Sequence, residues 1–260
     1  MFLADEPTLS VARHKMGNGR DGVSFLRARG GEAQRSSGME NMQVGNARYL
    51  KPGDLPETVV VFPLSGALLL PGAQLPLNIF EPRYLAMIDA AIAGNRLIAM
   101  VQPALGEPAD SPNLSRVGCL GRITSMSETG DGRYIIALTG ICRIRLMEEV
   151  TAHQPYRIFR ITPFISDLKS HHEEGTVDRP ALLSAFRAYL EANKLEADWE
   201  SVERADNMML VNSLSMMAPF DPAEKQALLE AHDLKTRAET FIAIIKIVLA
   251  GSGDTGSVLQ

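Results

Sequence analysis

Residues 62–84, FPLSGALLLPGAQLPLNIFEPRY, decide the fold of this chain, because four prolines divide a nearly uncharged stretch into short elements. A proline fixes φ, lacks a main-chain N–H and pushes the residue before it toward extended geometry, so no long helix can form before residue 81. Alternating apolar residues over 75–80 predict a strand, and the proline within it indicates an edge strand or a bulge. The positions that punctuate the stretch are Pro63, Pro71, Gly72, Pro76 and Pro82.

The spacing of apolar residues changes from that of a strand to that of a helix at the end of this stretch. Pro71-Gly72 predicts a turn between two extended segments. From Pro82 onward, apolar residues recur at helical spacing through Ile92, with the proline at a tolerated first-turn position and Gly94 as the stop. The block therefore predicts a strand, a turn, an irregular strand and the start of a helix.

The composition is that of an ordinary globular protein. The chain has 260 residues, of which 45% are hydrophobic and 22% are charged, and a net charge of −5. This modest charge gives no electrostatic reason to expect nucleic acid or an anionic membrane as partner. Cys119 and Cys142 form no CxxC pair, which favours a reducing cytoplasm, and neither a membrane span nor a signal peptide is evident.

Residues 57–166 are expected to form a β-rich subdomain. Short β-branched or alternating runs are separated by turn signals, and Thr129-Gly130-Asp131-Gly132 is a strong hairpin turn. Gly118 and Gly121 mark bulges or close main-chain approach. At least six short strands and one helix predict a closed or nearly closed antiparallel β-barrel. The runs are 59–62, 97–101, 117–126, 133–138, 142–146 and 156–161.

After residue 166 the sequence is first polar and then has apolar residues at helical spacing. Residues 167–179 are expected to be a linker, and residues 180–250 a bundle of four helices. Asp178, Asp198 and Asp221 are candidate caps at helix starts. Residues 251–260 are expected to be a disordered tail.

Residues 1–48 are expected to be a disordered tail or a misassigned start, with Met39 or Met42 as the alternative first residue. Their sparse apolar content cannot offset the entropy of ordering. Residues 17–22 match the bare GxGxxG pattern for dinucleotide binding, but the buried strand and following helix which that mechanism needs are missing.

The central stretch resembles the signature of the Lon protease N-terminal domain, the substrate-recognition part of a bacterial ATP-dependent protease that also occurs as a stand-alone protein. The resemblance implies a PUA-like β-barrel followed by a helical second half, a fold of the α+β class. At Asn78 the family often has His, so no role for an imidazole is implied there. The matching segments are 62–64, 70–72, 75–77, 79–84, 117–118, 131–134, 155–157 and 224–230, with Ile123, Gly140 and Arg143.

The sequence contains none of the common catalytic motifs considered below. No Gly-Lys dipeptide is present, so a Walker A loop is absent, and neither a Gly-x-Ser-x-Gly elbow nor a Lon-type ATPase or Ser-Lys protease region is found. Residues 171–174, His-His-Glu-Glu, lack the HExxH spacing and are interpreted as a solvated loop rather than a metal site. No enzyme activity, cofactor or metal is expected.

The candidate peptide-binding residues are Phe80, Glu81, Arg83 and Tyr84, where a proline-interrupted edge is suited to limited strand addition. Glu81 and Arg83 are also expected to form an ion pair that fixes the strand-to-helix junction. The methionines at 208, 209, 216 and 217 are interpreted as core packing, with an adaptable peptide surface as the alternative.

These observations favour a non-catalytic, cytoplasmic module that binds unfolded or exposed apolar polypeptide segments, as an adaptor or regulator of an ATP-dependent protease. The alternative is an RNA-binding module with a basic stripe on adjacent strands. Counterion release would make such RNA affinity fall steeply with salt. A lesser alternative is a hydrolase active without any added protease. The arginines of the proposed stripe are Arg143, Arg145, Arg157 and Arg160.

Overall fold

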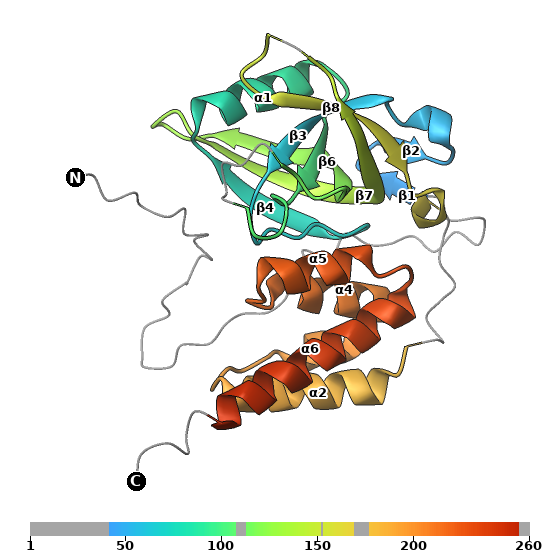
Figure 1. Ribbon diagram of the computed structural model, residues 1–260, viewed down its shortest axis with the longest axis vertical. Coiled ribbons are helices and arrows are strands. Elements are labelled where there is room, and N and C mark those ends of the chain that lie inside the picture. The colour runs from blue at the N-terminus through green and yellow to red at the C-terminus, as the bar shows by residue number, and fades with distance from the viewer. Residues whose placement is uncertain (1–41, 108–112, 152, 169–176, 255–260) are drawn as a thin grey trace.

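The computed structural model describes residues 42–107, 113–151, 153–168 and 177–254. The strands and one helix form one half of the molecule, and the other five helices form the second half (Figure 1). The fold is therefore mixed α+β. The strands are β1 (Met42–Val44), β2 (Ala47–Tyr49), β3 (Thr58–Pro63), β4 (Gln74–Ile79), β5 (Leu97–Val101), β6 (Val117–Glu128), β7 (Tyr134–Glu149) and β8 (Arg157–Pro163). The helices are α1 (Pro82–Ala93), α2 (Arg179–Ala192), α3 (Trp199–Arg204), α4 (Asn207–Met217), α5 (Pro222–Glu230) and α6 (Leu234–Asp254), with 3-10 turns η1 (Pro52–Asp54) and η2 (Ile165–Leu168).

Six strands form the large sheet in the order β4-β7-β6-β5-β3-β8, and β7 pairs with β8 as well. β4 is an edge strand, as Pro76 predicted. The expectation that all the strands run antiparallel is wrong for one pair, because β3 and β5 are parallel. The connection between them contains α1, and a long crossover of this kind lets a strand return in the same direction.

β7 is one strand of 16 residues rather than the two short runs expected from the sequence. Its first part, from Tyr134 to Thr139, pairs with β4, and its last part, from Ile144 to Glu149, pairs with β8. The pairing of β6 with β7 shifts register between Leu120 and Gly121. Because a bulge bends a strand, one continuous β7 serves two different neighbours.

The expected disorder over residues 1–48 is wrong for residues 42–48. β1 and β2 form a hairpin in which Val44 and Tyr49 are buried against residues of the large sheet. Most residues of this segment are polar or glycine, so its composition predicts disorder, but Val44 and Tyr49 bury enough apolar surface to pack the hairpin against the sheet. Residues 1–41, with the GxGxxG match and Met39, lie outside the described residues.

The helical half differs from expectation at three places. The helix predicted from Asp198 is two helices, since Ala205 is extended and Asp206 caps α4 by accepting a hydrogen bond from Met209 N. The linker expected at 167–179 is structured at both ends: Asp167 and Leu168 are buried in η2, and α2 begins at Arg179. α6 continues to Asp254, four residues past the expected boundary, and residues 255–260 lie outside the described residues.

The cap predictions at Asp178, Asp198 and Asp221 are confirmed, the last one as a capping box with Glu224. Two apolar clusters fill the interior. One lies among the strands and includes the β1–β2 hairpin, and the other extends from the sheet across to α2–α6. The two halves thus share a continuous core.

Candidate functional site

The predicted site residues lie where β4 ends and α1 begins. Glu81 precedes the first turn of α1, and Pro82 occupies its first position. Phe80 has no strand or helix assignment and is 53% exposed, which is unusual for a phenylalanine. The guanidinium of Arg133, from the hairpin opposite, lies 5.9 Å from the centre of its ring. The ring of Phe80 is therefore presented to solvent beside a cation.

Tyr84 is buried and does not share the exposure of Phe80. Its ring lies 4.4 Å from that of Phe62, and its hydroxyl donates to Pro63 O at 3.4 Å. Burial raises the pKa of the Tyr84 phenol above its usual value. Tyr84 thus anchors α1 on β3 and positions the corner, while the ring of Phe80 is exposed to solvent.

Glu81 and Arg83 form the predicted ion pair at 2.8 Å. The side chains are 40% and 49% exposed, so the pair contributes no more than about 1 kcal/mol to stability. It nevertheless neutralises both charges next to Phe80.

The register of the strands adds a residue that sequence reasoning missed. Asn78 of β4 lies opposite Ile135 of β7, and Ile135 lies opposite Ser127 of β6. Ile135 is 51% exposed and shares the outer face of the sheet with Phe80. The sequence contains Ile135-Ile136, and only the register shows which of the two points outward.

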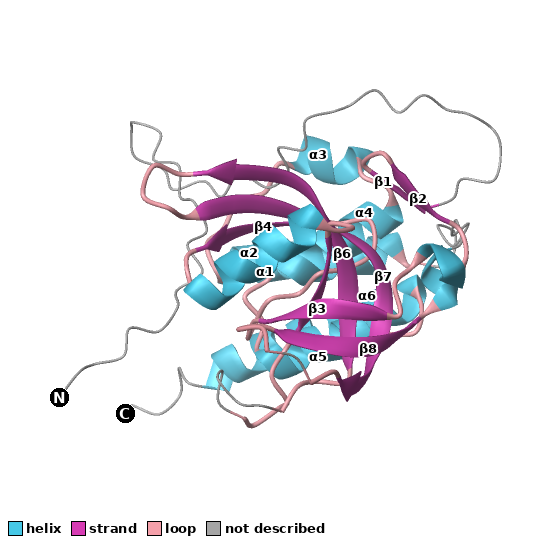
Figure 2. Ribbon diagram, turned by 90° about the horizontal axis from the view of Figure 1, so that it is seen from above, coloured by secondary structure: helices cyan, strands magenta, loops and turns pink. Residues whose placement is uncertain are grey.

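On the outer face, Gln74, Pro76 and Asn78 of β4 and the residues of β7 opposite them carry no charge, while β6 carries Arg122 opposite Thr139. The hairpin of β6 and β7 extends beyond the rest of the sheet, with β4 beside it (Figure 2). Apolar and neutral polar side chains alternate over this surface, which we call the wing face. It consists of Gln74, Pro76, Asn78, Phe80, Ser127, Ile135, Ala137 and Thr139.

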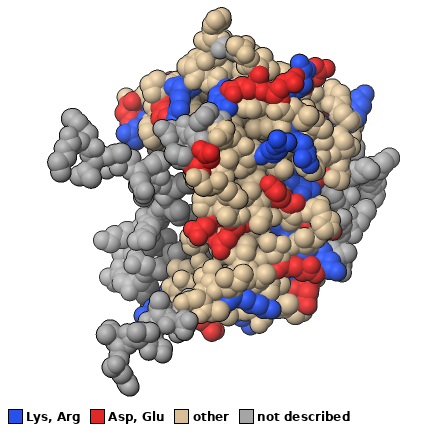
Figure 3. All heavy atoms as spheres, viewed as in Figure 1, with Lys and Arg blue, Asp and Glu red and all other residues tan. Residues whose placement is uncertain are grey.

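The proposed arginine stripe is not assembled on the surface. Arg143 is buried, whereas Arg157 pairs with Glu149 at 2.6 Å, and Arg160 pairs with Glu148 at 2.8 Å. Arg145 is exposed and stacks near Phe164. On the face seen in Figure 3, basic and acidic groups are interspersed rather than gathered by sign.

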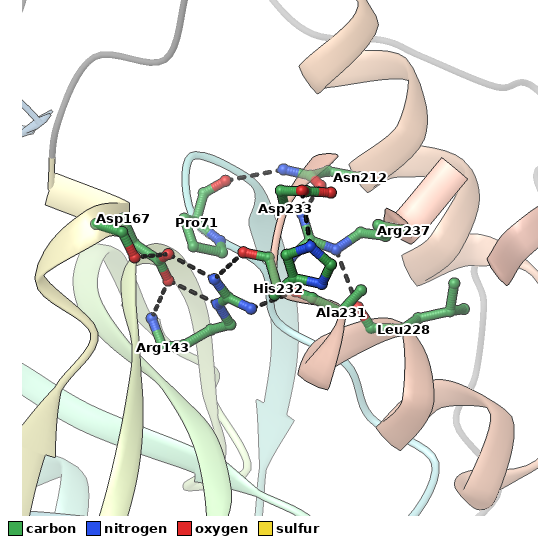
Figure 4. A network of polar contacts seen from close by, with 10 residues as sticks. Pro71, Arg143, Asp167, Asn212, Leu228, Ala231, His232, Asp233 and Arg237 are labelled. Carbon is green, nitrogen blue, oxygen red and sulfur yellow. Dashed lines mark hydrogen bonds and ion pairs between the residues drawn. The ribbon is translucent and has the colours of Figure 1, made fainter. Parts of the chain in front are cut away.

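Arg143 instead belongs to a buried polar network between the halves (Figure 4). It pairs with Asp167 at 2.7 Å and also donates to Ala231 O and, at 3.1 Å, to His232 O. Burial acts to lower the pKa of Arg143, but Asp167 outweighs it and leaves that pKa above the usual value. For the neighbouring Arg237, burial lowers the pKa to about 10, with the charge of Arg143 as the second cause.

The predicted turn at Pro71 reaches the same network. Asn212 of α4 donates to Pro71 O at 3.0 Å and accepts from Arg237 at 3.1 Å. The turn also passes very close to β7: a Cβ at Gly140 would lie 2.1 Å from Leu70 O. The central stretch thus supplies both the exposed corner and a contact to the helices.

The methionines, the potential metal ligands and the cysteines in the described part of the chain do not come together in a second site. Met209 and Met217 are nearly half exposed, while Met208 and Met216 pack against the core, so the four methionines are divided between the two interpretations. In the described part of the chain, no cluster of three potential metal ligands occurs, and no helix is long and apolar enough to cross a membrane. Residues 171–174 lie outside it. Cys119 and Cys142 are buried and free.

Comparison with known proteins places the chain in a family. The model of the ATP-dependent protease La (LON) substrate-binding domain matches residues 58–246, so the chain belongs to this family. It is similar to the Lon protease of Desulfosudis oleivorans, with 39% identity over 97 residues that make up 35% of this chain and 12% of that protein. It is also similar to Lon protease 2 of Myxococcus xanthus, with 25% identity over 202 residues, or 74% of this chain and 24% of that protein.

Among solved structures, the N-terminal domain of Mycobacterium avium complex Lon protease matches with a TM-score of 0.56 and 18% identity. That match covers 73% of this chain and 98% of the other. The chain has a Lon N-terminal-domain-like fold, and it spans between an eighth and a quarter of the length of the two Lon proteases above.

Proposed function

We propose that this chain is a non-catalytic recognition module that binds unfolded or exposed apolar segments of other proteins through the wing face. In this proposal it acts in the cytoplasm as an adaptor or regulator of an ATP-dependent protease. The observation that carries the proposal is the exposure of Phe80 and Ile135 on this face beside an edge strand, in a chain of the Lon substrate-binding family.

The physical chemistry of the wing face supports polypeptide as the ligand. Large exposed apolar side chains grouped on one surface commonly mark an interaction site. An edge strand offers main-chain donors and acceptors that do not depend on the sequence of the ligand. Together they suit a protein that must bind many different unfolded chains.

The architecture supports the finer parts of the proposal as well. The pairing of β7 with β8 in addition to β6 is what a closed PUA-like barrel requires, and α2–α6 suit a helical bundle. The family match includes neither an ATPase nor a protease region, which supports a module without hydrolytic activity.

Binding of a labelled model protein, kept unfolded by reduction and carboxymethylation, tests the proposal by fluorescence anisotropy. Phe80→Ser and Ile135→Ser should each weaken binding by about tenfold, as expected for exposed apolar anchors. Ile247→Ser is the matched control, because Ile247 is 69% exposed on α6 of the other half.

Crosslinking to an intact ATP-dependent protease tests the second part. Absence of binding to both the unfolded protein and the protease would contradict the proposal. Salt-sensitive RNA binding in a filter assay, or proteolysis without added protease, would favour the alternative functions instead.

A further inference from the structure

We propose that the outer edge of β4 takes up an extended, uncharged polypeptide segment by strand addition, and that Pro76 divides the added ladder and so limits its strength. This inference rests on the proposed function. It names the class of segment that binds and the residue that sets its affinity.

The direction of the main-chain groups in β4 follows from one hydrogen bond. Gly140 N donates to Ala73 O at 2.9 Å, so Ala73 points toward β7. Main-chain groups alternate in direction along an antiparallel strand. Gln74, Pro76 and Asn78 therefore point away from β7, toward the outer edge. The missing N–H of Pro76 removes nothing from the pairing with β7.

The outer edge offers an incomplete set of partners. Gln74 and Asn78 each present an N–H and a C=O, whereas Pro76 presents only a C=O. Within the described ranges, no strand pairs with this edge. An added strand thus finds donors toward both ends of β4 and none at its centre, so one of its carbonyls stays without a partner.

The lack of charge along the outer edge of β4 determines which polypeptide segments can bind there. The side chains of β4 along the edge, Gln74, Pro76 and Asn78, are neutral. At the corner, Glu81 pairs with Arg83 and Asp131 with Arg133. Farther from the edge, Asp89 accepts a hydrogen bond from Tyr134, and Arg122 donates to Asn95 O. A charged side chain on the added segment would lose water without gaining an opposite charge. Apolar side chains at every second position would instead lie beside the neutral side chains of β4 and the exposed ring of Phe80. The surface therefore favours segments from protein interiors over charged surface segments.

The first test uses the full chain and a blocked, fluorescent decapeptide that alternates Val or Phe with Thr or Asn. Pro76→Ala restores an N–H at the centre of the edge, and the peptide should then bind roughly 2- to 12-fold more tightly. Pro52→Ala is the matched control, since Pro52 lies in η1, which packs against β2. A peptide with a central Asp or Lys should bind at least tenfold more weakly to the unaltered chain.

The second test needs no variant of the protein. Peptides carrying a single N-methyl group at successive positions should lose affinity at alternate positions only, because only every second N–H of an added strand faces β4. A flat profile, or unchanged affinity in Pro76→Ala, together with binding by the unaltered chain, would overturn strand addition but leave the proposed function standing. Absence of binding of both the peptide and an unfolded protein to the unaltered chain would overturn both.

Discussion

Arg143 and Asp167 form an ion pair at 2.7 Å in which each side chain is only 5% exposed. The same guanidinium donates to two main-chain oxygens in the turn between α5 and α6. One side chain of β7 therefore connects the end of the sheet half to the helical half. Its guanidinium is compensated by a carboxylate and by carbonyl groups, which a buried charge requires.

Removing one partner of this pair should be strongly destabilising. Arg143→Met leaves the carboxylate of Asp167 buried without its cation, and the free energy of unfolding should fall by about 3–5 kcal/mol. Urea denaturation measures the change. Arg145→Met, two residues along the same strand and exposed, should stay within about 0.5 kcal/mol of the unaltered chain.

The double variant Arg143→Met, Asp167→Leu separates the pair from the rest of the packing. It removes both charges, so it should cost less than the sum of the two single changes. Strict additivity would show that the two residues act independently, against the pairing described above.

Asn212 should matter because it serves the turn at Pro71 and the buried Arg237 together. Asn212→Leu leaves the carbonyl of Pro71 and one guanidinium N–H of Arg237 without a partner, which should cost about 1–3 kcal/mol. The exposed amide of Gln74 provides the comparison, and Gln74→Leu should be nearly neutral in the same urea titration. Equal effects of the two changes would argue against the network.

Gly140 should not tolerate a methyl group. The added Cβ would collide with the main-chain oxygen of Leu70, and a main-chain atom cannot move aside as the end of a flexible side chain can. Gly140→Ala should therefore destabilise the fold by about 1–3 kcal/mol. Gly130 lies in the hairpin loop with open space around it, and Gly130→Ala is the control. A thermal melt of the two variants compares them, and similar midpoints would refute the close approach.

The buried thiols predict how stability changes in alkali. Burial raises the pKa of Cys142 from 9.0 to about 12, so between pH 9 and pH 12 the folded chain holds a proton that the unfolded chain releases. The contribution of this thiol is therefore fully present below pH 9 and is lost as the pH rises toward 12. The loss amounts to about 1.4 kcal/mol per pH unit.

Urea titrations at pH 8 and pH 10 measure this effect. The decrease between the two pH values should be smaller in Cys142→Ala than in the unaltered chain. An identical decrease would show that Cys142 does not hold its proton in the folded state.

The local course of the chain could be predicted where residues have strong intrinsic preferences. Prolines placed the edge strand and the start of α1, and aspartates placed the starts of α2, α3 and α5. Long-range relationships could not be predicted in this way. The alternation around Cys142 and Arg143 suggested a half-exposed strand, but both residues are buried because the helical half covers one side of the sheet there.

The candidate site shows the same division. Phe80 followed from the proline-bounded strand, whereas the exposure of Ile135 depends on the register of β4, β7 and β6. Tyr84 has helical spacing and an aromatic side chain, and its sequence context does not reveal that it packs under the corner. Asp167 was assigned to a linker because its neighbours are polar, and its partner is 24 residues away.

The hairpin of β1 and β2 bears on how a fragment of this protein should be cut. The family match begins at residue 58, but Val44, Tyr49 and Leu55 lie before it and are buried among the strands. A fragment trimmed to the family boundary would open that interior to water, at about 1.5–3 kcal/mol for each large apolar side chain withdrawn. An excised domain that begins at or before Met42 keeps the hairpin that covers this apolar interior. One that begins at residue 58 should be prone to aggregation for reasons unrelated to its ligands.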